Sequence, residues 1–136
     1  MGFRGIPESD LYFDDVSVPV DHLVVPAGGF PKLMQAFDLE RCGNATMALG
    51  QASGALEDAL VWVQDRQQFG KPIAEFQLIQ AMLADSRAEA YAARSMVIDA
   101  AARFDRGERI TMEAACCKYY CTEMVGRIAD RAVQIH

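Results

Sequence analysis

The chain has 136 residues, of which 51% are apolar and 24% are charged, and its formal net charge is −6. This composition is typical of one compact globular domain and excludes a disordered chain. The negative charge argues against a nucleic-acid or anionic-membrane partner, because both bind clustered lysine and arginine. No apolar run is long enough to span a membrane and no signal-like segment follows Met1, so we expect a cytoplasmic location by default.

Residues 8–25 differ in pattern from the rest of the chain. Between Val16 and Val20 a valine takes every second position, which is the period of a half-buried strand. Pro19 restricts such a strand to a sheet edge, and an isolated strand is not stable in water. We therefore expect residues 1–27 to be the terminal piece of a β-domain and a linker, cut from a larger protein that supplies the strand's partners.

Amphipathic helices are expected throughout residues 28–136. The pattern predicts a short helix from Phe30 to Phe37 and then a long helix that starts at Asp38, an N-cap candidate. A second long helix is expected over about 73–104, and Thr111 is expected to cap a third. Predicted core positions recur at steps of three and four: Ala45, Leu49, Ala52, Leu56, Leu60 and Val63, then Phe76, Ile79, Leu83, Ala90, Val97 and Phe104, and finally Ala114, Cys117, Cys121, Met124, Ile128 and Ile135.

These elements predict a mainly α protein, an antiparallel helical bundle with a short N-terminal β segment. The second helix also has apolar residues off its stripe, so we expect it to be buried on more than one side. Three helices leave one stripe without a partner, which another copy of the chain would bury. Gly43, Gly50 and Gly54 share a helix face, where each costs about 1 kcal/mol, so close approach of another helix or a ligand is expected there.

The four cysteines, at positions 42, 116, 117 and 121, have no histidine at metal-ligand spacing. Only Cys117 and Cys121 share a helix face. We expect the cysteines to be small buried packing residues and predict no zinc or other metal site.

The turn between the first two long helices is the most specific stretch of the chain. Gly70 suits the left-handed position after a helix, and Pro72 suits the first turn of the next helix. Arg66, Gln67 and Gln68 are then expected in the last turn of the first helix. By these signals alone the stretch is a helix–helix corner. However, Arg66-Gln67-Gln68-Phe69-Gly70-Lys71-Pro72-Ile73, followed by Glu75-Phe76-Gln77, closely resembles the hairpin of the acyl-CoA dehydrogenase C-terminal domain.

This resemblance implies a flavin cofactor. It implies that Arg66, Gln68 and Phe69 contact FAD held mainly by a neighbouring subunit, with Gln77 beside its adenine part. Val133-Gln134-Ile135-His136 resembles the start of the family's Gln-Ile-His-Gly-Gly segment, which implies a further cofactor contact at Gln134. The resemblance also implies a homo-oligomer, a dimer or tetramer that shares FAD between subunits, and an electron-transfer flavoprotein as electron acceptor.

Residues Phe37-Asp38-Leu39-Glu40-Arg41 place two acids and an arginine in one helical turn. Without the resemblance, this is ordinary helix-start electrostatics. The resemblance implies that the turn lines an acyl-CoA pocket, with Asp38 and Arg41 contacting the CoA moiety. Isovaleryl-type members carry the catalytic glutamate at the position of Glu40, whereas others carry it on a loop downstream of the position of His136. We therefore predict Glu40 as the base and keep a glutamate beyond His136 as the alternative.

The resemblance implies that the parent protein is an FAD-dependent acyl-CoA dehydrogenase of fatty acid metabolism, catalysing α,β-desaturation of an acyl-CoA thioester. Residues 28–136 would be its C-terminal helical-bundle domain, truncated at its end and inactive alone. Two alternatives stay open. One is an acyl-CoA oxidase or an enoyl-CoA-reducing flavoenzyme on the same scaffold, and the other is a non-catalytic helical self-association module.

Overall fold

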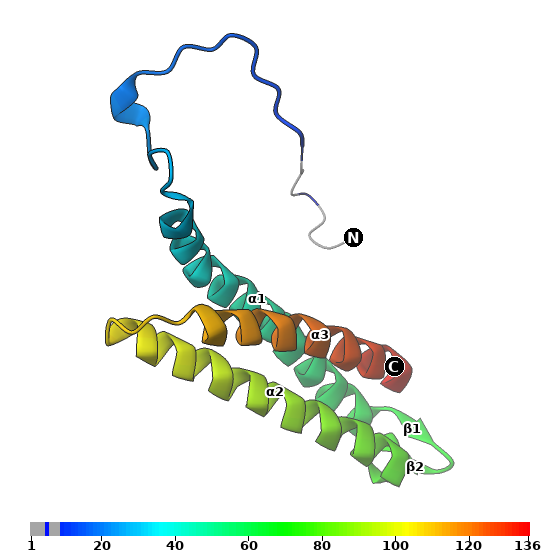
Figure 1. Cartoon of the computed structure of the whole chain (residues 1–136). Coiled ribbons are helices and arrows are strands. Elements are labelled where there is room, and N and C mark those ends of the chain that lie inside the picture. Colours follow the sequence, from blue (N-terminus) through cyan, green and yellow to red (C-terminus); the bar gives the residue numbers. More distant parts are fainter. Residues whose placement is uncertain (1–4, 6–8) are drawn as a thin grey trace.

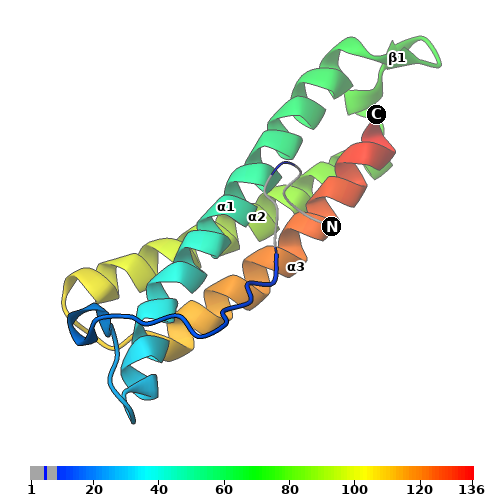
Figure 2. The same cartoon turned by 90° about the horizontal axis from the view of Figure 1, so that it is seen from above.

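Three long helices form the molecule, which is a computed structural model that describes residue 5 and residues 9–136. They are α1 (Phe30–Asp65), α2 (Gln77–Asp105) and α3 (Thr111–Ile135). Short connections turn the chain back twice, so α2 runs antiparallel to its two neighbours (Figure 1). Helices α1 and α3 lie side by side along most of the bundle, as a view from above also shows (Figure 2). The predicted mainly α, antiparallel bundle is confirmed.

Helix α1 is one continuous helix of 36 residues, and it begins earlier than predicted. Its N-cap is Gly29, where a Cβ atom would lie only 2.9 Å from the carbonyl oxygen of Pro26, so a larger residue does not fit the turn. The predicted helix start at Asp38 is wrong. Asp38 lies within α1, and its carboxylate is held by side chains instead of capping backbone N–H groups.

A small hairpin joins α1 to α2. Strands β1 (Gln67–Gln68) and β2 (Lys71–Pro72) pair antiparallel, and a 3-10 turn, η2 (Ile73–Glu75), leads into α2. The two residues between the strands have φ angles of 53° at Phe69 and 80° at Gly70, the signs of a type I′ turn. The left-handed Gly70 is thus confirmed. The expected place of Arg66–Gln68 in the last helical turn is wrong, because α1 ends at Asp65 and the chain then pairs as a hairpin.

The core lies mainly between α1 and α3. All six core positions predicted for α3 are buried, and so are four of those predicted for α1: Ala45, Ala52, Leu56 and Val63. The buried residues of α2 are small, namely Ser86, Ala90, Ala93 and Ala100, of which only Ala90 was predicted. The predicted Leu83 and Val97 pack against this core but are only partly buried. The expected burial of α2 on several sides is wrong for the described chain, where Leu78 is 81% exposed.

Two of the four cysteines belong to the core as predicted, namely Cys117 and Cys121. Burial raises the pKa of the Cys117 thiol to about 11, with smaller contributions from neighbouring thiols, so this group stays protonated at neutral pH. Cys42 is half-buried, and Cys116 is exposed, contrary to the expectation for that residue. Within the described residues no metal-binding group of three or more His, Cys, Asp or Glu side chains occurs.

An ion-pair cluster fastens α2 to α3. The Glu89 carboxylate accepts hydrogen bonds from Arg131 Nη1 at 2.9 Å and from Arg127 Nε at 3.0 Å. The hydrogen bond from Arg131 is the main reason why the pKa of Glu89 is lowered, and Arg127 adds to it. These contacts hold the C-terminal half of α3 against the middle of α2.

The described N-terminal segment forms no strand. Residues 9–24 are exposed, and their one regular element is a 3-10 turn, η1 (Val20–His22). The segment leads away from the bundle (Figure 1), so the strand predicted over 8–25 has no backbone partner there, while residue 8 lies outside the described residues. An unpaired strand is not stable, which explains the difference.

The glycine face of α1 meets no neighbour among the described residues. A Cβ atom at Gly43, Gly50 or Gly54 would meet nothing within 4 Å. The close approach predicted for this face is therefore not made by the described part of the chain. None of the described helices combines the length and the apolar character needed to cross a membrane.

Candidate functional site

The first candidate site lies where the early part of α1 meets the start of α3. Asp38 is 5% exposed, and each of its carboxylate oxygens has a partner. Oδ1 accepts from Arg41 Nη1 at 3.0 Å, one helical turn along α1. Oδ2 accepts from the hydroxyl of Thr111 at 2.7 Å, 73 residues away in the sequence. The expected grouping of Asp38 with Arg41 is thus present, and Thr111 joins them.

The N-terminal residue of α3 has a different role from the one predicted. Thr111 makes no capping hydrogen bond to the backbone of α3, whose N-cap residue is Ile110. Its hydroxyl donates to Asp38 and accepts from Arg109 Nε at 3.2 Å. Arg109 and Thr111 were missed as site residues. A threonine before an apolar run is typical of a helix cap, and nothing in the local pattern points to a distant aspartate.

These residues line a hollow of about 270 Å³ between the two helices. Arg41 contributes one guanidinium from α1, and Arg109 contributes a second from the loop before α3. The remaining lining consists of Pro31, Met34 and Ala115 and one polar residue, Gln35. Two arginines around one hollow form a setting for a phosphate-bearing ligand, because guanidinium groups bind phosphate oxygens in pairs.

Glu40, the predicted base, lies on the other side of α1. It follows Asp38 by two residues, which turns it by about 200° around the helix. In the described chain its side chain is exposed, whereas Asp38 is buried. A catalytic carboxylate needs a site that excludes water. The residues described here leave Glu40 open to solvent.

The second candidate site is the hairpin between α1 and α2. Arg66 follows the last residue of α1, and Gln68 and Phe69 lead into the turn; all three are exposed. Phe69 is 92% exposed and left-handed, a costly conformation for a bulky residue. Its ring meets the edge of Phe76 with 6.1 Å between centroids. An exposed aromatic ring beside an arginine is suited to contact a ligand or a second chain.

The two predicted glutamine contacts lie at the same end of the bundle as the hairpin. Gln77 is the first residue of α2 and is exposed. Gln134 is exposed in the last turn of α3. The end of α3 reaches the end of α1, where the rings of His136 and Trp62 stack with 5.2 Å between centroids. Figure 1 shows the start of α2 and the end of α3 at the hairpin end of the bundle, and Gln77 and Gln134 belong to these two helix ends.

The two candidate sites lie at opposite ends of α1. Arg41 and Arg66 are 25 positions apart, and the residues between them belong to the continuous helix α1. At a rise of 1.5 Å per residue this corresponds to roughly 37 Å. A single small group cannot touch both sites of one chain.

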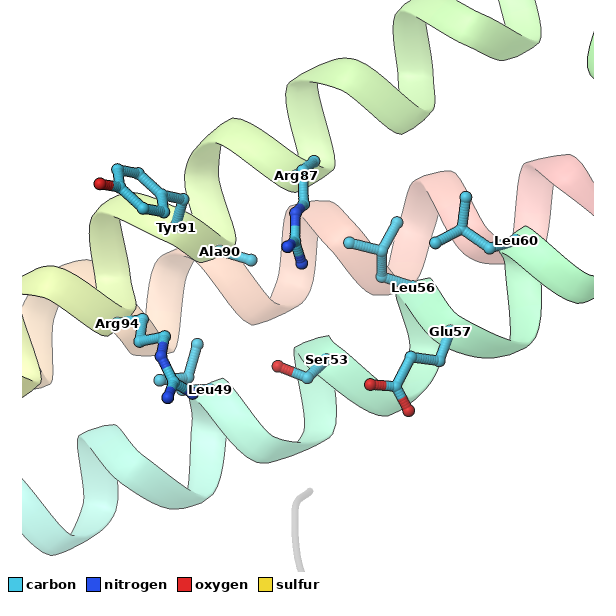
Figure 3. Close-up of a pocket in the computed structure, with 9 residues that line it drawn as sticks. All are labelled: Leu49, Ser53, Leu56, Glu57, Leu60, Arg87, Ala90, Tyr91 and Arg94. Carbon is cyan, nitrogen blue, oxygen red and sulfur yellow. The ribbon is translucent and has the colours of Figure 1, made fainter.

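A groove runs between α1 and α2, away from both sites (Figure 3). Leu49, Leu56 and Leu60 line it from α1. From α2, Arg87 and Arg94 extend toward α1, while Tyr91 points away (Figure 3). None of the predicted site residues lines this groove.

Comparison with known proteins decides the family. The profile described as "Acyl-CoA dehydrogenase, C-terminal domain" matches residues 27–136. The chain belongs to the acyl-CoA dehydrogenase family. This match covers α1, the hairpin, α2 and α3, so both candidate sites lie within the family's C-terminal domain.

Two curated family members and one solved structure show how closely the chain follows the family. The 3-sulfinopropanoyl-CoA desulfinase of Cupriavidus necator is 42% identical over all of this chain and 35% of its own length. The caffeyl-CoA reductase–Etf complex subunit CarC of Acetobacterium woodii is 39% identical over all of this chain and 36% of its own. The butyryl-CoA dehydrogenase structure from Megasphaera elsdenii aligns with a TM-score of 0.87 and 40% identity, over 90% of this chain and 32% of that one.

This acyl-CoA dehydrogenase chain spans about a third of the length of the curated relatives it matches. By their names, those relatives include a desulfinase and a reductase as well as a dehydrogenase. Family membership therefore establishes the scaffold, and one scaffold can support several reactions.

Proposed function

We propose that the chain is the C-terminal helical part of an FAD-dependent enzyme that desaturates an acyl-CoA thioester between its α and β carbons. The observation that carries this proposal is the family match over residues 27–136. The desulfinase, the reductase and the dehydrogenase described above are each named for a CoA thioester, which supports it. Each candidate site fits one of the two ligands that such a reaction needs.

The CoA part of the substrate is assigned to the hollow between α1 and α3. CoA carries phosphate groups, and Arg41 and Arg109 present two guanidinium groups to one hollow of about 270 Å³. Asp38 is assigned to this site as well. Because both of its oxygens are already bonded within the chain, its contribution is to hold its neighbours.

Glu40 is proposed as the base that removes the α-proton. When bound, FAD supplies the acceptor for the hydride that leaves the β-carbon. Glu40 is exposed in the described chain, so the remaining parts of the enzyme and the bound substrate must exclude water around it. A glutamate elsewhere in the full-length protein remains the alternative base.

The hairpin is assigned to FAD held by a neighbouring subunit. Arg66 offers a guanidinium for a pyrophosphate, Phe69 offers an exposed ring, and Gln68 lies between them in the sequence. Gln77 and Gln134 lie at the same end and complete the proposed contacts. The hairpin lies roughly 37 Å along α1 from the hollow of the same chain. A flavin that reacts with the thioester in one subunit's hollow is therefore more easily contacted by the hairpin of a neighbouring subunit.

A homo-oligomer follows from this assignment, as a dimer or a tetramer. The open α1–α2 groove and the uncovered glycine face of α1 are surfaces that further helices could cover. An electron-transfer flavoprotein is proposed as the electron acceptor, since CarC is named as a subunit of a complex with Etf. The proposed location is cytoplasmic, and fatty acid metabolism is the proposed context.

A second function has a specific observation in its favour. CarC is 39% identical to this chain and is named as a reductase, so the same scaffold can hydrogenate an enoyl-CoA. An acyl-CoA oxidase differs from the dehydrogenase and the reductase in how readily molecular oxygen accepts the electrons of the reduced flavin.

The test is to purify the full-length protein and mix it without oxygen with a panel of acyl-CoA thioesters. The proposal predicts bound FAD, loss of its visible absorbance on mixing, and an enoyl-CoA product two mass units lighter. Rapid reoxidation by oxygen would identify an oxidase, and turnover only from enoyl-CoA with a reduced electron donor would identify a reductase. Absence of bound flavin, or no reaction with any thioester, would contradict the flavoenzyme assignment.

A further inference from the structure

We propose that Thr111 is a positioning residue that sets the directions of Arg41 and Arg109 around the CoA hollow. This inference rests on the proposed function of that hollow. Three hydrogen bonds form an unbroken chain from one arginine to the other. Arg109 Nε donates to Thr111 Oγ1 at 3.2 Å, Thr111 Oγ1 donates to Asp38 Oδ2 at 2.7 Å, and Arg41 Nη1 donates to Asp38 Oδ1 at 3.0 Å.

The hydroxyl of Thr111 is the pivot of this chain. A hydroxyl has one proton to donate, and here the proton is directed to Asp38. Its lone pairs are then free to accept from Arg109. The direction of both bonds is fixed, because the carboxylate can only accept and the guanidinium can only donate.

Asp38 transmits the same constraint to Arg41. Asp38 is 5% exposed, so each of its carboxylate oxygens is expected to be bonded within the protein. With Oδ2 bonded to Thr111, Oδ1 faces the guanidinium of Arg41, whose side chain is 34% exposed. The buried acid thus anchors one end of a solvent-accessible arginine and leaves the rest of its fork for a ligand.

Both arginines line the same hollow. Arg41, Arg109 and Thr111 all line it, although they come from α1, from the loop before α3 and from α3 itself. Loss of the hydroxyl would remove the hydrogen bond to Arg109 and leave Asp38 Oδ2 without its partner, so the carboxylate would no longer be held in its direction toward Arg41. Ligand binding would then cost the conformational entropy of ordering two long side chains.

The test uses the full-length, flavin-loaded protein and coenzyme A as the titrant in calorimetry. Thr111→Val keeps the shape of the side chain and removes the hydroxyl. We expect it to weaken CoA binding by about tenfold, whereas Thr111→Ser stays within about threefold of the wild type. In turnover assays the loss should fall on KM, with kcat changed less than about twofold. Thr122→Val on the same helix is the matched control, because its hydroxyl bonds only to backbone carbonyls of α3.

The possible outcomes separate this inference from the proposed function. If Arg41→Ala weakens CoA binding but Thr111→Val does not, Thr111 has no positioning role. If Thr111→Ser is as weak as Thr111→Val, the hydroxyl is not the group that matters, and the inference is again wrong. Should Thr111→Val fail to fold, Thr111→Ala, which also lacks the hydroxyl, takes its place, and CoA binding as tight as in the wild type would overturn the inference. If the wild type does not bind CoA at all, the proposed function fails, and the inference fails with it.

Discussion

Asp38 and Glu40 are two residues apart in α1 and face opposite sides of it. Asp38 is 5% exposed and bonded to Thr111, whereas Glu40 is open to solvent. Two acids in one helical turn therefore have different surroundings. Asp38 is fixed inside the chain, and Glu40 is free to meet a substrate.

Replacement of Glu40 by glutamine tests the assignment of the base. Glu40→Gln keeps the size of the side chain and removes its ability to accept the α-proton. We expect kcat of the full-length enzyme to fall by at least about 100-fold, with little change in affinity for CoA. Glu57→Gln, another exposed glutamate of α1, is the control and should keep full activity. Activity of Glu40→Gln within a few-fold of the wild type would move the base to another glutamate.

Replacement of Phe69 separates stability from cofactor binding. Phe69 is left-handed at φ 53° and 92% exposed, so its ring contributes strain and little burial to the chain. Phe69→Gly should leave the free energy of unfolding unchanged or raise it by up to about 1 kcal/mol, because glycine adopts this conformation freely. We expect affinity for FAD to fall at the same time, as measured by flavin released on dilution.

The control for this variant is Tyr91→Ala, which removes an aromatic residue that is 71% exposed on α2. It should keep its flavin. A Phe69→Gly protein that retains FAD as tightly as the wild type would show that the ring does not contact the cofactor.

The Glu89 cluster predicts a pH-dependent contribution to stability. Glu89 bonds to both Arg127 and Arg131, and its pKa is lowered below the ordinary value of 4.5, chiefly by the hydrogen bond from Arg131. A carboxylate with a lowered pKa stabilises the fold above the pKa of the unfolded chain, and this contribution is lost as the pH falls through the folded pKa. Glu89→Gln should therefore cost about 1–2 kcal/mol at pH 7.

The difference between Glu89→Gln and the wild type should shrink as the pH falls below about 4.5 toward the lower folded pKa. Urea unfolding at several pH values measures it. Asp99→Asn, which removes an exposed partner of Arg103, is the control and should cost less at pH 7. A constant difference between pH 7 and pH 3 would mean that the ionised carboxylate is not what stabilises the helix pair.

Much of the fold follows from local pattern. Six of the seven buried residues of α3 were predicted, all but Ala132, because its apolar residues recur at helical spacing along one face. The left-handed backbone conformation of Gly70 was likewise predicted, because glycine favours the left-handed position that follows a helix. The core face of α2 was predicted in part. Ala90 is buried as expected and Leu83 and Val97 pack partly buried against the core, whereas the buried Ser86, Ala93 and Ala100 were missed because they carry no clear hydrophobic signal.

The errors at the candidate site have a different origin. Asp38 and Thr111 both match helix-start signals, and their mutual bond spans 73 positions, so no local pattern reveals it. Arg109 precedes α3 in a loop and becomes a site residue only through the packing of α3 on α1. The prediction of an N-terminal strand was wrong for a related reason, because strand pairing depends on residues that this part of the chain does not supply.

Mixed oligomers test the central claim most directly, which is that the hairpin of one subunit serves the flavin of its neighbour. Full-length subunits carrying Glu40→Gln are combined with subunits carrying Arg66→Ala and Phe69→Ala, each with its own affinity tag, and the mixed species is isolated. Each parent alone should be nearly inactive. If the hairpin acts between subunits, one site of each mixed pair has an intact base and an intact hairpin, and about half of the wild-type activity per pair should return. If the mixed species stays as inactive as its parents while it remains folded and assembled, the hairpin does not serve a neighbouring subunit's flavin, and the account is contradicted.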